Sequence, residues 1–470
     1  MITDDTICAI STPAGAGAIA IVRMAGPQAF QITEKVFRPA SANKKISTQP
    51  THTLLFGTIT DGQNDIDEVV ISLFRAPRSF TGDDIVEISC HGSVYIQQKI
   101  LNLLIDNGAR MAKPGEFTQR AFLNGKMDLS QAEAVADLIA AQSESARRVA
   151  LQQMKGGFSN ELINLRNKLL EFTSLIELEL DFSEEDVEFA DRRQLIDLVD
   201  QIDTVLKNLI NSFSLGNAIK NGIPVAIAGP ANAGKSTLLN ALLNEERAIV
   251  SDVPGTTRDA IEDVININGL TFRFIDTAGI RETHDKVENI GIKLTYNKIS
   301  KASVILLMMD ARDEDQNIHR TVMDVKKHMN ADQQKLILII NKVDLVDSST
   351  INQRFSEDAF RELTGTDAIV PLSAKHRTNL DNLIDHLLQT VDTNAIDNNQ
   401  VVVTNARHYE ALKKAREGIL RTRDGLLNGI SGDFIAQDIR EVLHYLGEIT
   451  GQITTDEVLG NIFKNFCIGK

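Results

Sequence analysis

One eight-residue run constrains the fold of this chain more than any other feature: Gly229-Pro230-Ala231-Asn232-Ala233-Gly234-Lys235-Ser236. It follows an apolar, strand-like stretch at 224–228 and precedes a helix-forming stretch at 237–243. Glycines let the backbone curl so that successive N–H groups point at one anion, and the helix N-terminus adds its positive dipole end. Lys235 is placed to reach the β- and γ-phosphates of a nucleotide, and Ser236 to bind Mg²⁺. The run predicts a phosphate-binding loop; a Gly-rich turn without a ligand is the alternative, which the flanking strand and helix disfavour.

The chain as a whole has the composition of a globular protein with several domains. Its 470 residues suffice for roughly three domains, each with its own core. The net charge of -15 argues against a protein that coats nucleic acid or anionic membrane through bulk electrostatics. No apolar run reaches the ~18 residues of a membrane span, and the N-terminus is acidic, unlike a secretory signal. We therefore expect a cytoplasmic protein without a membrane span.

The composition and the hydrophobic periodicity of the sequence change three times along the chain, which predicts four segments. Residues 1–125 alternate short β-rich runs with turns, and 126–221 are rich in Ala, Leu, Glu and Gln at helical spacing. Residues 222–392 alternate apolar strands with helices, and 393–470 are helical again. Two helical stretches around a complete α/β domain predict that this domain is inserted into one discontinuous helical domain. The fold class is thus multidomain, α/β plus all-α.

Several local signals refine this prediction. Unbroken apolar strands in 222–392 are typical of a parallel sheet covered by helices on both faces. Asn268-Gly269 between two strand-like runs predicts a hairpin, and hence one antiparallel edge strand on that sheet. Ser130 with Glu133, and Thr454 with Glu457, each have the spacing of a capping box at a helix start.

Downstream of the phosphate loop, three further motifs end predicted strands. They are Asp276-Thr277-Ala278-Gly279, Asn341-Lys342-Val343-Asp344 and Ser373-Ala374-Lys375. The first can hold a Mg²⁺ water, and the last two can form a base pocket. Between loop and hairpin lies Gly255-Thr256-Thr257-Arg258-Asp259, where a threonine hydroxyl can complete Mg²⁺ coordination only when the γ-phosphate is present. The phosphate loop and the three motifs that end predicted strands are four motifs in the order expected of a GTPase, and they predict that activity.

Base choice and catalysis depend on two different carboxylates. Asp344 can accept both N–H groups of guanine's Watson–Crick edge, and adenine has no such pair of donors, so we expect GTP rather than ATP. Ile280 stands where Ras-type proteins have a water-orienting glutamine, so another group must act on the attacking water. The sequence offers carboxylates and possible arginine fingers: Glu288, Glu282, Arg258 and Arg281. Ion pairs within the switch loop remain an alternative for both arginines.

Other runs connect these motifs to a known family. They are Pro114-Gly115-Glu116-Phe117-Thr118, Arg120 to Lys126, Gln131-Ala132-Glu133-Ala134 and the terminal Cys467-Ile468-Gly469-Lys470. With the GTPase motifs, they make the chain resemble the bacterial MnmE (TrmE) tRNA-modification GTPases from end to end. That family is similar to the Era- and EngA-like potassium-activated GTPases.

The resemblance implies a folate site in residues 1–125, called the N-terminal tetrahydrofolate-binding and dimerisation domain. A 5-formyl- or 5,10-methylene-tetrahydrofolate would be bound by Arg23, Glu87, Lys126 and Lys470. Basic side chains can pair with the glutamate tail of folate, and a carboxylate can accept from the pterin N–H edge. Apart from the family, Arg23 and Lys126 would be surface charges and Glu87 a strand residue.

For the GTPase domain, the resemblance implies K⁺ in the place of an arginine finger and hydrolysis when two such domains meet. Asn232, Ser251, Val253 and Thr256 would bind K⁺, and Ser236 and Thr257 would bind Mg²⁺. Glu288 falls at the family's catalytic carboxylate position and would act with Lys235. The GTP site would comprise Asn232, Ala233, Gly234, Lys235, Ser236, Thr237, Ser251, Asp252, Val253, Pro254, Gly255, Thr256, Thr257, Asp276, Thr277, Ala278, Gly279, Asn341, Lys342, Val343, Asp344, Ser373, Ala374 and Lys375.

The family's output is an aminomethyl or carboxymethylaminomethyl group at the 5-position of the wobble uridine in certain tRNAs. It is made by a heterotetramer-type complex with the FAD-dependent partner MnmG (GidA). Two other functions remain open: a ribosome-assembly GTPase that only switches, and a scaffold whose GTPase controls assembly on a membrane or filament. The sequence contains neither an evident KH-like RNA module nor a basic amphipathic helix.

The three cysteines are the last feature. Cys8, Cys90 and Cys467 lie far apart, so neither a disulfide framework nor a zinc site is indicated. Cys467 is a candidate functional residue by its place in the terminal motif, with a small tail residue as the alternative.

Overall fold

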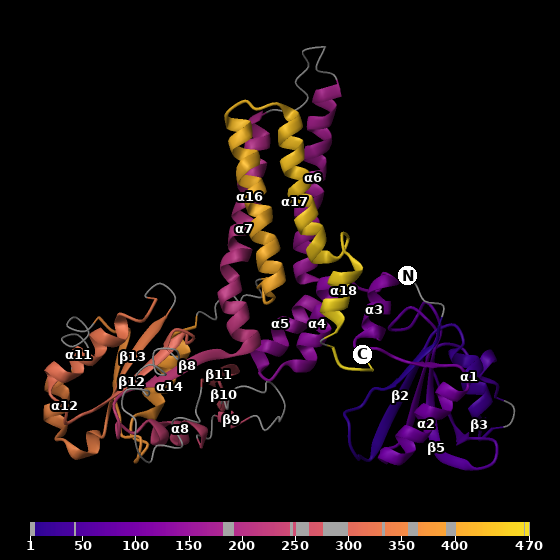
Figure 1. Ribbon diagram of the computed structural model, residues 1–470, viewed down its shortest axis with the longest axis horizontal. Helices are drawn as coiled ribbons and strands as arrows, with labels where there is room; N and C mark the ends of the chain where they lie inside the picture. The colour runs from indigo at the N-terminus through magenta and orange to yellow at the C-terminus, as the bar shows by residue number, and fades with distance from the viewer. Residues whose placement is uncertain are drawn as a thin grey trace. The chain divides into compact units, whose positions relative to one another are not determined.

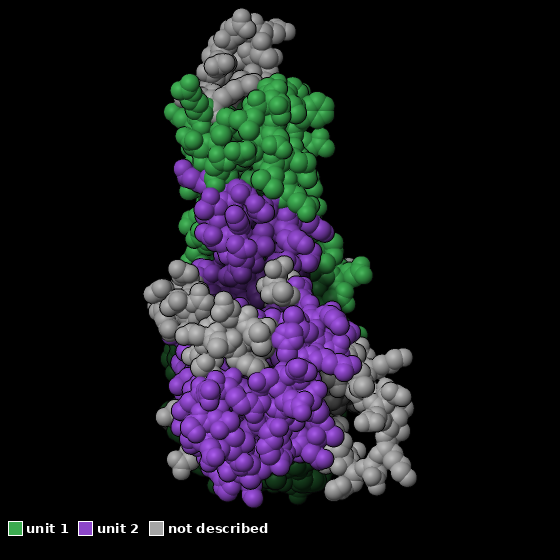
Figure 2. All heavy atoms as spheres, turned by 90° about the vertical axis from the view of Figure 1, so that its left-hand side faces the viewer, with its two compact units in different colours: residues 1–139, 152–200, 417–470 green, residues 140–151, 201–416 purple. Residues whose placement is uncertain are grey.

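The computed structural model describes residues 5–41, 44–181, 192–244, 248–250, 263–275, 299–330, 334–355, 365–391, 401–464 and 466–469. Figure 1 shows the helices and strands along the chain, and Figure 2 shows the two compact units into which the chain divides. Unit 1 comprises residues 1–139, 152–200 and 417–470, and unit 2 comprises 140–151 and 201–416. The division falls within two long helices, α7 (Arg192–Asn221) and α16 (Ala406–Leu427).

Unit 1 contains a seven-stranded sheet among its described residues, in the order β3-β4-β5-β6-β2-β1-β7. The strands are β1 (Ile7–Ile10), β2 (Ile19–Ala25), β3 (Phe37–Pro39), β4 (Thr53–Thr60), β5 (Asp65–Phe74), β6 (Ile85–His91) and β7 (Arg110–Met111). The described neighbours all pair antiparallel except β1 with β7. The short β-rich runs predicted for residues 1–125 are confirmed, whereas β3 and β7 have three and two residues, too few for a periodic pattern.

Helices cover one face of this sheet, because alternate side chains of each strand are apolar on that face. Cys8, Val22 and Ile88 of the sheet pack with Ile32 of α1 (Ala29–Val36) and Leu104 of α2 (Val94–Asp106). A short 3₁₀ helix, η1 (Ile46–Thr48), follows β3. The other face exposes Ile19, Leu54, Phe56 and Val70 and is called the open face below.

The helices of unit 1 continue the chain from the sheet to the C-terminus. They are α3 (Glu116–Leu123), α4 (Leu129–Ala140), α6 (Gly157–Asp181), α17 (Gly432–Thr450) and α18 (Asp456–Phe463); α5 (Glu144–Met154) begins in unit 2. α6 packs along α17. α18 packs near the start of α4 through Leu459 and Phe463 against Leu129 and Ala132. Sequence-distant segments therefore share one core in unit 1.

The two predicted capping boxes are wrong in position. The box at α4 is formed by Asp128 and Gln131: Asp128 Oδ1 accepts from the Gln131 N–H at 2.9 Å, and Gln131 Oε1 accepts from the Asp128 N–H at 2.9 Å. Ser130 and Glu133 lie buried within the helix. At α18, Thr455 rather than Thr454 accepts from the Val458 N–H. Asp and Gln serve as well as Ser and Glu in such a box, so adjacent candidates compete.

Unit 2 contains a second seven-stranded sheet in its described part, in the order β14-β13-β12-β8-β11-β10-β9. The strands are β8 (Ile223–Ala228), β9 (Ala248–Val250), β10 (Asp263–Ile267), β11 (Leu270–Phe274), β12 (Val304–Asp310), β13 (Lys335–Asn341) and β14 (Ala368–Pro371). The described strands β8, β11, β12, β13 and β14 are parallel, and β10 runs against them. This confirms the mostly parallel sheet with one antiparallel strand; β9 pairs outside β10, so β10 is second from the edge.

Both faces of this sheet are covered by helices, as the apolar strands predicted. On one face pack α8 (Lys235–Leu243) and α14 (Leu380–Gln389), and on the other α11 (Asp315–Lys326) and α12 (Ser348–Arg354). The hairpin between β10 and β11 turns at Asn268 (φ 49°) and Gly269 (φ 81°), which confirms the Asn-Gly signal. No helix in the described ranges is long and apolar enough to cross a membrane.

Candidate functional site

The phosphate loop lies between β8 and α8, at the carboxyl end of a parallel strand. Gly229 (φ 140°) and Gly234 (φ 103°) have backbone conformations that side chains rarely adopt. A Cβ added to Gly229 would lie 2.2 Å from the carbonyl oxygen of Met308, and one added to Gly234 would lie 2.3 Å from Asn341 Nδ2. Both positions therefore need glycine, because the loop backbone packs closely against the ends of β12 and β13.

The polar side chains of this loop differ in how they are placed. Lys235 Nζ donates to the carbonyl oxygens of Gly229 at 2.9 Å and Pro230 at 2.8 Å, so the lysine folds back over the loop. Ser236 and Thr237 are exposed in the first turn of α8. Asn232 is exposed and holds a left-handed conformation, φ 61°, without being glycine. Such a conformation is tolerated by asparagine more readily than by most residues.

Asn341 connects the phosphate loop to the predicted base pocket. It is buried at the end of β13, where its Nδ2 donates to the Ala233 carbonyl at 2.7 Å and its Oδ1 accepts from the Ala374 N–H at 3.0 Å. One side chain thus holds the phosphate loop and the loop of residues 373–375 at a fixed spacing. The structure brings together the described members of three of the sequence motifs.

Asp344 points its carboxylate toward the same loop. It lies in a 3₁₀ turn, η3 (Val343–Leu345), and Oδ1 accepts a hydrogen bond from Ser373 Oγ at 2.6 Å. That hydrogen bond, with smaller contributions from His376 and Lys375, lowers the pKa of Asp344 below its ordinary value. An ionised, exposed carboxylate at this position is an acceptor for paired N–H donors.

Lys342 and Asp310 form an ion pair that sequence reasoning missed. Lys342 has a left-handed backbone, φ 65°, and its Nζ lies 2.8 Å from Asp310 Oδ2. Arg312 also contacts Asp310, and its hydrogen bond is the main cause that holds the pKa of Asp310 well below its usual range. Asp310 and Asn341 are register partners at the ends of adjacent parallel strands. The sequence signal that could have indicated this ion pair is the carboxylate of Asp310 at the end of an apolar strand.

The remaining predicted nucleotide-site residues lie outside the described residues. These are Ser251, Asp252, Val253, Pro254, Gly255, Thr256, Thr257, Asp276, Thr277, Ala278, Gly279 and Glu288, together with Glu282, Arg258 and Arg281.

A second cluster lies on the open face of unit 1. Arg23 of β2 and Glu87 of β6 are cross-strand register partners, and Arg23 Nη2 lies 2.7 Å from Glu87 Oε1. Arg23 Nη1 also donates to the carbonyl oxygen of Gly469 at 3.2 Å. About a fifth of each charged side chain is exposed, 19% for Arg23 and 21% for Glu87. Two of the predicted folate residues are therefore in contact and reachable by a ligand.

The C-terminal tail is seated on the same unit. The Gly469 carbonyl also accepts from Ser11 Oγ at 3.2 Å, and the Cys467 carbonyl accepts from the Gly115 N–H at 3.4 Å. Gly469 has φ 95°, and an added Cβ would lie 2.5 Å from the Ile10 carbonyl oxygen. The tail therefore needs glycine at 469 to reach Arg23. Lys470 lies outside the described residues.

Lys126 is exposed after α3, and its Cε would lie 3.4 Å from a Cβ added to Gly82. It therefore borders the loop of residues 75–84 that leads into β6.

The three cysteines differ in exposure. Cys8 and Cys90 are buried, and burial raises the pKa of each thiol to about 11, so neither is a thiolate at neutral pH. Cys467 is exposed. Within the described residues, His, Cys, Asp and Glu side chains form no cluster suited to a metal ion.

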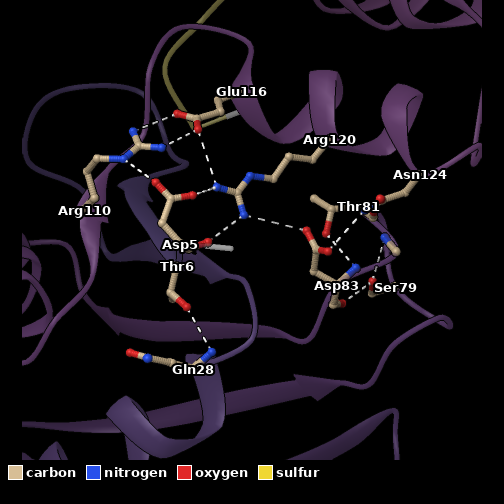
Figure 3. Close-up of polar contacts among 11 residues, drawn as sticks. Asp5, Thr6, Gln28, Ser79, Thr81, Asp83, Arg110, Glu116, Arg120 and Asn124 are labelled. Atoms are coloured by element: carbon tan, nitrogen blue, oxygen red, sulfur yellow. Dashed lines mark hydrogen bonds and ion pairs between the residues drawn. The ribbon is translucent and has the colours of Figure 1, made fainter. Parts of the chain in front are cut away.

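A charged network in unit 1 was also missed by sequence reasoning (Figure 3). Arg120 Nη2 lies 2.6 Å from Asp5 Oδ1, and Arg110 pairs with both Asp5 and Glu116 at 2.7 and 2.6 Å. Burial would raise the pKa of Glu116, but hydrogen bonds from Arg110 and the Lys113 N–H outweigh it and hold this pKa below its usual range. Glu116 and Arg120 belong to the sequence runs on which the family resemblance rests. Their spacing in the sequence alone does not indicate which residues they contact.

Comparison with known proteins decides the family. A family model described as the MnmE helical domain matches residues 129–467, and one described as the GTP-binding protein TrmE N-terminus matches 6–126. The chain is 54% identical over 472 residues to a tRNA modification GTPase MnmE of Bacteroides thetaiotaomicron, with 99% of each chain covered. The chain belongs to the MnmE family. An MnmE of Bacteroides fragilis is 56% identical over 467 residues, again with 99% of each chain covered, and one of Flavobacterium johnsoniae is 53% identical with full coverage of both chains.

Solved structures resemble a part of this MnmE-family chain. A single-residue variant of Aquifex aeolicus Era bound to GDP.AlF4- is 26% identical, covers 42% of this chain and 66% of its own, and has a TM-score of 0.27. The G domain of the T. maritima FeoB iron transporter is 21% identical, covers 36% of this chain and 99% of its own, and has a TM-score of 0.25. Membership of the MnmE family rests on the family models and the full-length relatives.

Proposed function

We propose that this chain binds and hydrolyses GTP, and that hydrolysis serves modification of the wobble uridine in certain tRNAs. The observation that supports the proposal most is the pair of hydrogen bonds made by the Asn341 side chain. They connect the phosphate loop to the loop of residues 373–375, the proposed guanine pocket, in a chain of the MnmE family. The curated relatives at 53–56% identity are named tRNA modification GTPases.

The described residues fit a guanine nucleotide with Mg²⁺. Gly229 and Gly234 let the loop backbone pack against Met308 and Asn341, where a Cβ at either position would clash. Lys235 would exchange its bonds to two loop carbonyls for bonds to phosphate oxygens. Asp344, fixed by Ser373, would accept from the guanine N–H groups. Ser236, with Thr257, would hold Mg²⁺, which neutralises charge on the phosphates.

We further propose that K⁺ binds beside the phosphates and that Asn232 is its side-chain ligand. Asn232 is exposed at the loop, and its left-handed backbone sets the direction of its side chain. Ser251, Val253 and Thr256 would supply the other oxygens. A cation fixed there would stabilise charge developing on the phosphate oxygens, the role for which an arginine finger is worth on the order of 10³ to 10⁵ in rate. Glu288 would act on the attacking water, with Lys235 on the phosphates.

In unit 1, we propose that Arg23, Glu87, Lys126 and Lys470 bind 5-formyl- or 5,10-methylene-tetrahydrofolate, which would supply the one-carbon unit. The contact between Arg23 and Glu87 supports this, since one cation and one carboxylate face the ligand together. The carbonyl of Gly469 orients Arg23, so docking of the tail and the geometry of the site depend on one another. Cys467 is the exposed thiol near this tail, and we propose a functional role for it without assigning its chemistry.

The domain arrangement follows from the same proposal. We propose a folate-binding domain at 1–125, a helical domain at 126–221 and 393–470, and a GTPase domain at 222–392. Packing of α6 along α17 supports the joined helical domain. So do ion pairs between α7 and α16, at 2.6 Å for Arg416 with Asp203 and 2.6 Å for Arg423 with Asp200.

Its partners would be a second copy of the chain, tRNA, and the FAD-dependent MnmG in a heterotetramer-type complex. The open face of unit 1 supports dimerisation through the N-terminal domain. Leu54, Phe56, Val70 and Ile19 expose 66%, 55%, 37% and 68% of their surfaces there, and Phe56 and Val70 are register partners. Adjacent exposed apolar side chains of this kind are typical of a protein interface.

The proposed function is tested by mass spectrometry of tRNA nucleosides from cells that lack this protein. Loss of the 5-substituted wobble uridine, restored by the intact gene, is the expected result. An unchanged nucleoside profile with defective ribosomal subunits would instead indicate an assembly GTPase.

A further inference from the structure

The loop of residues 75–84, between β5 and β6, holds a phenylalanine at the surface beside Arg23. Phe80 is 38% exposed, and the centre of its ring lies 5.9 Å from Arg23 Cζ. A second ring, that of buried Phe117, lies 5.6 Å from the same atom. The guanidinium therefore contacts one ring from the core and one that presents surface to solvent. Cation–π contacts of this length are attractive and favour the observed position of Arg23.

Hydrogen bonds hold the backbone on both sides of Phe80 (Figure 3). Ser79 Oγ donates to the Asp83 carbonyl at 2.5 Å and accepts from the Gly82 N–H at 3.0 Å. Thr81 is fully buried, and its carbonyl accepts from Asn124 Nδ2 at 2.7 Å. With both neighbours fixed in this way, the ring of Phe80 is kept at the surface instead of turning into the core.

A second contact ties this loop to the charged network. Asn124 Nδ2 also donates to Asp83 Oδ1 at 3.1 Å, and Arg120 Nη1 lies 3.9 Å from Asp83 Oδ2. Arg120 is in turn held by Asp5 and by Glu116. Asn124 and Arg120 are thus positioning residues for the loop. One residue of α3 and the residue at its C-terminal cap therefore both contact this surface loop.

We propose that Phe80 is the stacking surface for the flat ring of the ligand bound at Arg23 and Glu87. The inference rests on the proposed folate site and adds the residue that contacts the planar pyrimidine half of the reduced pterin there. Glu87 accepts from the N–H edge of the pterin while the pterin face lies on Phe80, and Lys126, beside Gly82 of the same loop, is available to an anionic group. Aromatic stacking favours flat rings over saturated ones of equal size.

The test uses the full-length chain, which contains no tryptophan. Phe80→Trp introduces a single fluorophore at the proposed contact, and 5-formyl-tetrahydrofolate is expected to quench it saturably. Tyr95→Trp is the matched control, since Tyr95 is 74% exposed on α2, which covers the other face of the sheet. Quenching of both variants to the same extent would contradict the proposal.

Calorimetry of the same ligand separates this inference from the folate site itself. Phe80→Leu keeps an apolar side chain but removes the ring, and we expect its dissociation constant to rise about 10-fold or more, whereas Phe80→Tyr retains binding. An unchanged thermal unfolding curve shows that the loop still folds. Equal affinities for wild type and Phe80→Leu would overturn the stacking role and leave the folate site standing. No binding heat for the wild type would overturn both.

Discussion

Asn341 holds the nucleotide site together through two hydrogen bonds, one to each loop that it separates. Because it is buried, loss of the side chain would leave the Ala233 carbonyl and the Ala374 N–H without these partners. Two other residues of the same motif make different contacts: Lys342 pairs with Asp310, and Asp344 accepts a hydrogen bond from Ser373. One four-residue motif therefore connects two loops, forms an ion pair and places the carboxylate for which we propose a role in base recognition.

Asp344→Asn should change base preference. The amide offers a donor where the carboxylate accepted, so we expect affinity for GDP to fall on the order of 10²-fold or more, and affinity for xanthosine diphosphate to rise. Equilibrium binding of both nucleotides measures the change. Asp347→Asn, an exposed aspartate at the start of α12, is the control and should bind GDP as the wild type does. Undiminished GDP affinity in Asp344→Asn would remove it from the base pocket.

Asn232→Ala should abolish the response to potassium. In the wild type, we expect GTP turnover to rise at least about 10-fold when Na⁺ is replaced by K⁺, since the bound cation stabilises the transition state. Asn232→Ala should turn over GTP at the same rate in both salts, and Asn240→Ala, exposed on α8, should behave as the wild type. If the wild type hydrolyses GTP at the same rate in Na⁺ and in K⁺, the proposed K⁺ site is wrong.

At the residue scale, sequence spacing was sufficient to single out residues whose chemistry and backbone conformation are both constrained, as at Gly229, Gly234 and Asn341. It was insufficient where a partner comes from a distant part of the chain. Asp310 reaches Lys342 only because two parallel strands end together, and Gly469 meets Arg23 only after the chain returns to its first domain.

Secondary-structure elements were predictable in proportion to their length and periodicity. The apolar strands and the Asn268-Gly269 turn are where the sequence indicated. The capping boxes were displaced by one or two residues because Asp128 and Thr455 are equally good caps. β7 was missed because a two-residue strand depends on its neighbour β1 and not on its own residues.

The network that joins α3 to the start of the chain should stabilise unit 1 in a pH-dependent way. The folded-state pKa of Glu116 is lowered, so its contribution is present above the ordinary glutamate pKa of about 4.3 and is lost as pH falls below that value. Glu116→Gln should therefore cost about 1–3 kcal/mol near neutral pH and less in acid.

Thermal unfolding of the full chain at several pH values measures this effect. Glu144→Gln is the control, since Glu144 and Arg147 form an exposed pair that contributes little. A destabilisation by Glu116→Gln that is the same at pH 7 and pH 3.5 would show that its charge is not the cause.

At the scale of the whole molecule, the open face of unit 1 carries both proposed interactions. Arg23, Glu87, Ser72 and Leu54 stand in one row across four strands, and Ile21, Ser89, Val70 and Phe56 stand in the next. The ligand cluster and the apolar patch are therefore adjacent parts of one surface. Folate binding and dimerisation are expected to influence each other.

Phe56→Lys should weaken the dimer. A charge in the middle of an apolar contact loses its hydration, so we expect the dimer dissociation constant to rise at least about 10-fold. Sedimentation equilibrium of the full chain gives the value, with Tyr95→Lys on the other face of the unit as control. A mass that is unchanged over the whole concentration range would place the interface elsewhere.

The central claim is that GTP hydrolysis in unit 2 serves tRNA modification. Its most direct test is the amount of 5-substituted wobble uridine in cells that lack the chain and carry either the intact gene or Lys235→Ala. The account predicts full modification with the intact gene and a loss of most of it with Lys235→Ala at equal protein level. Normal modification by a Lys235→Ala protein that hydrolyses no GTP would contradict it.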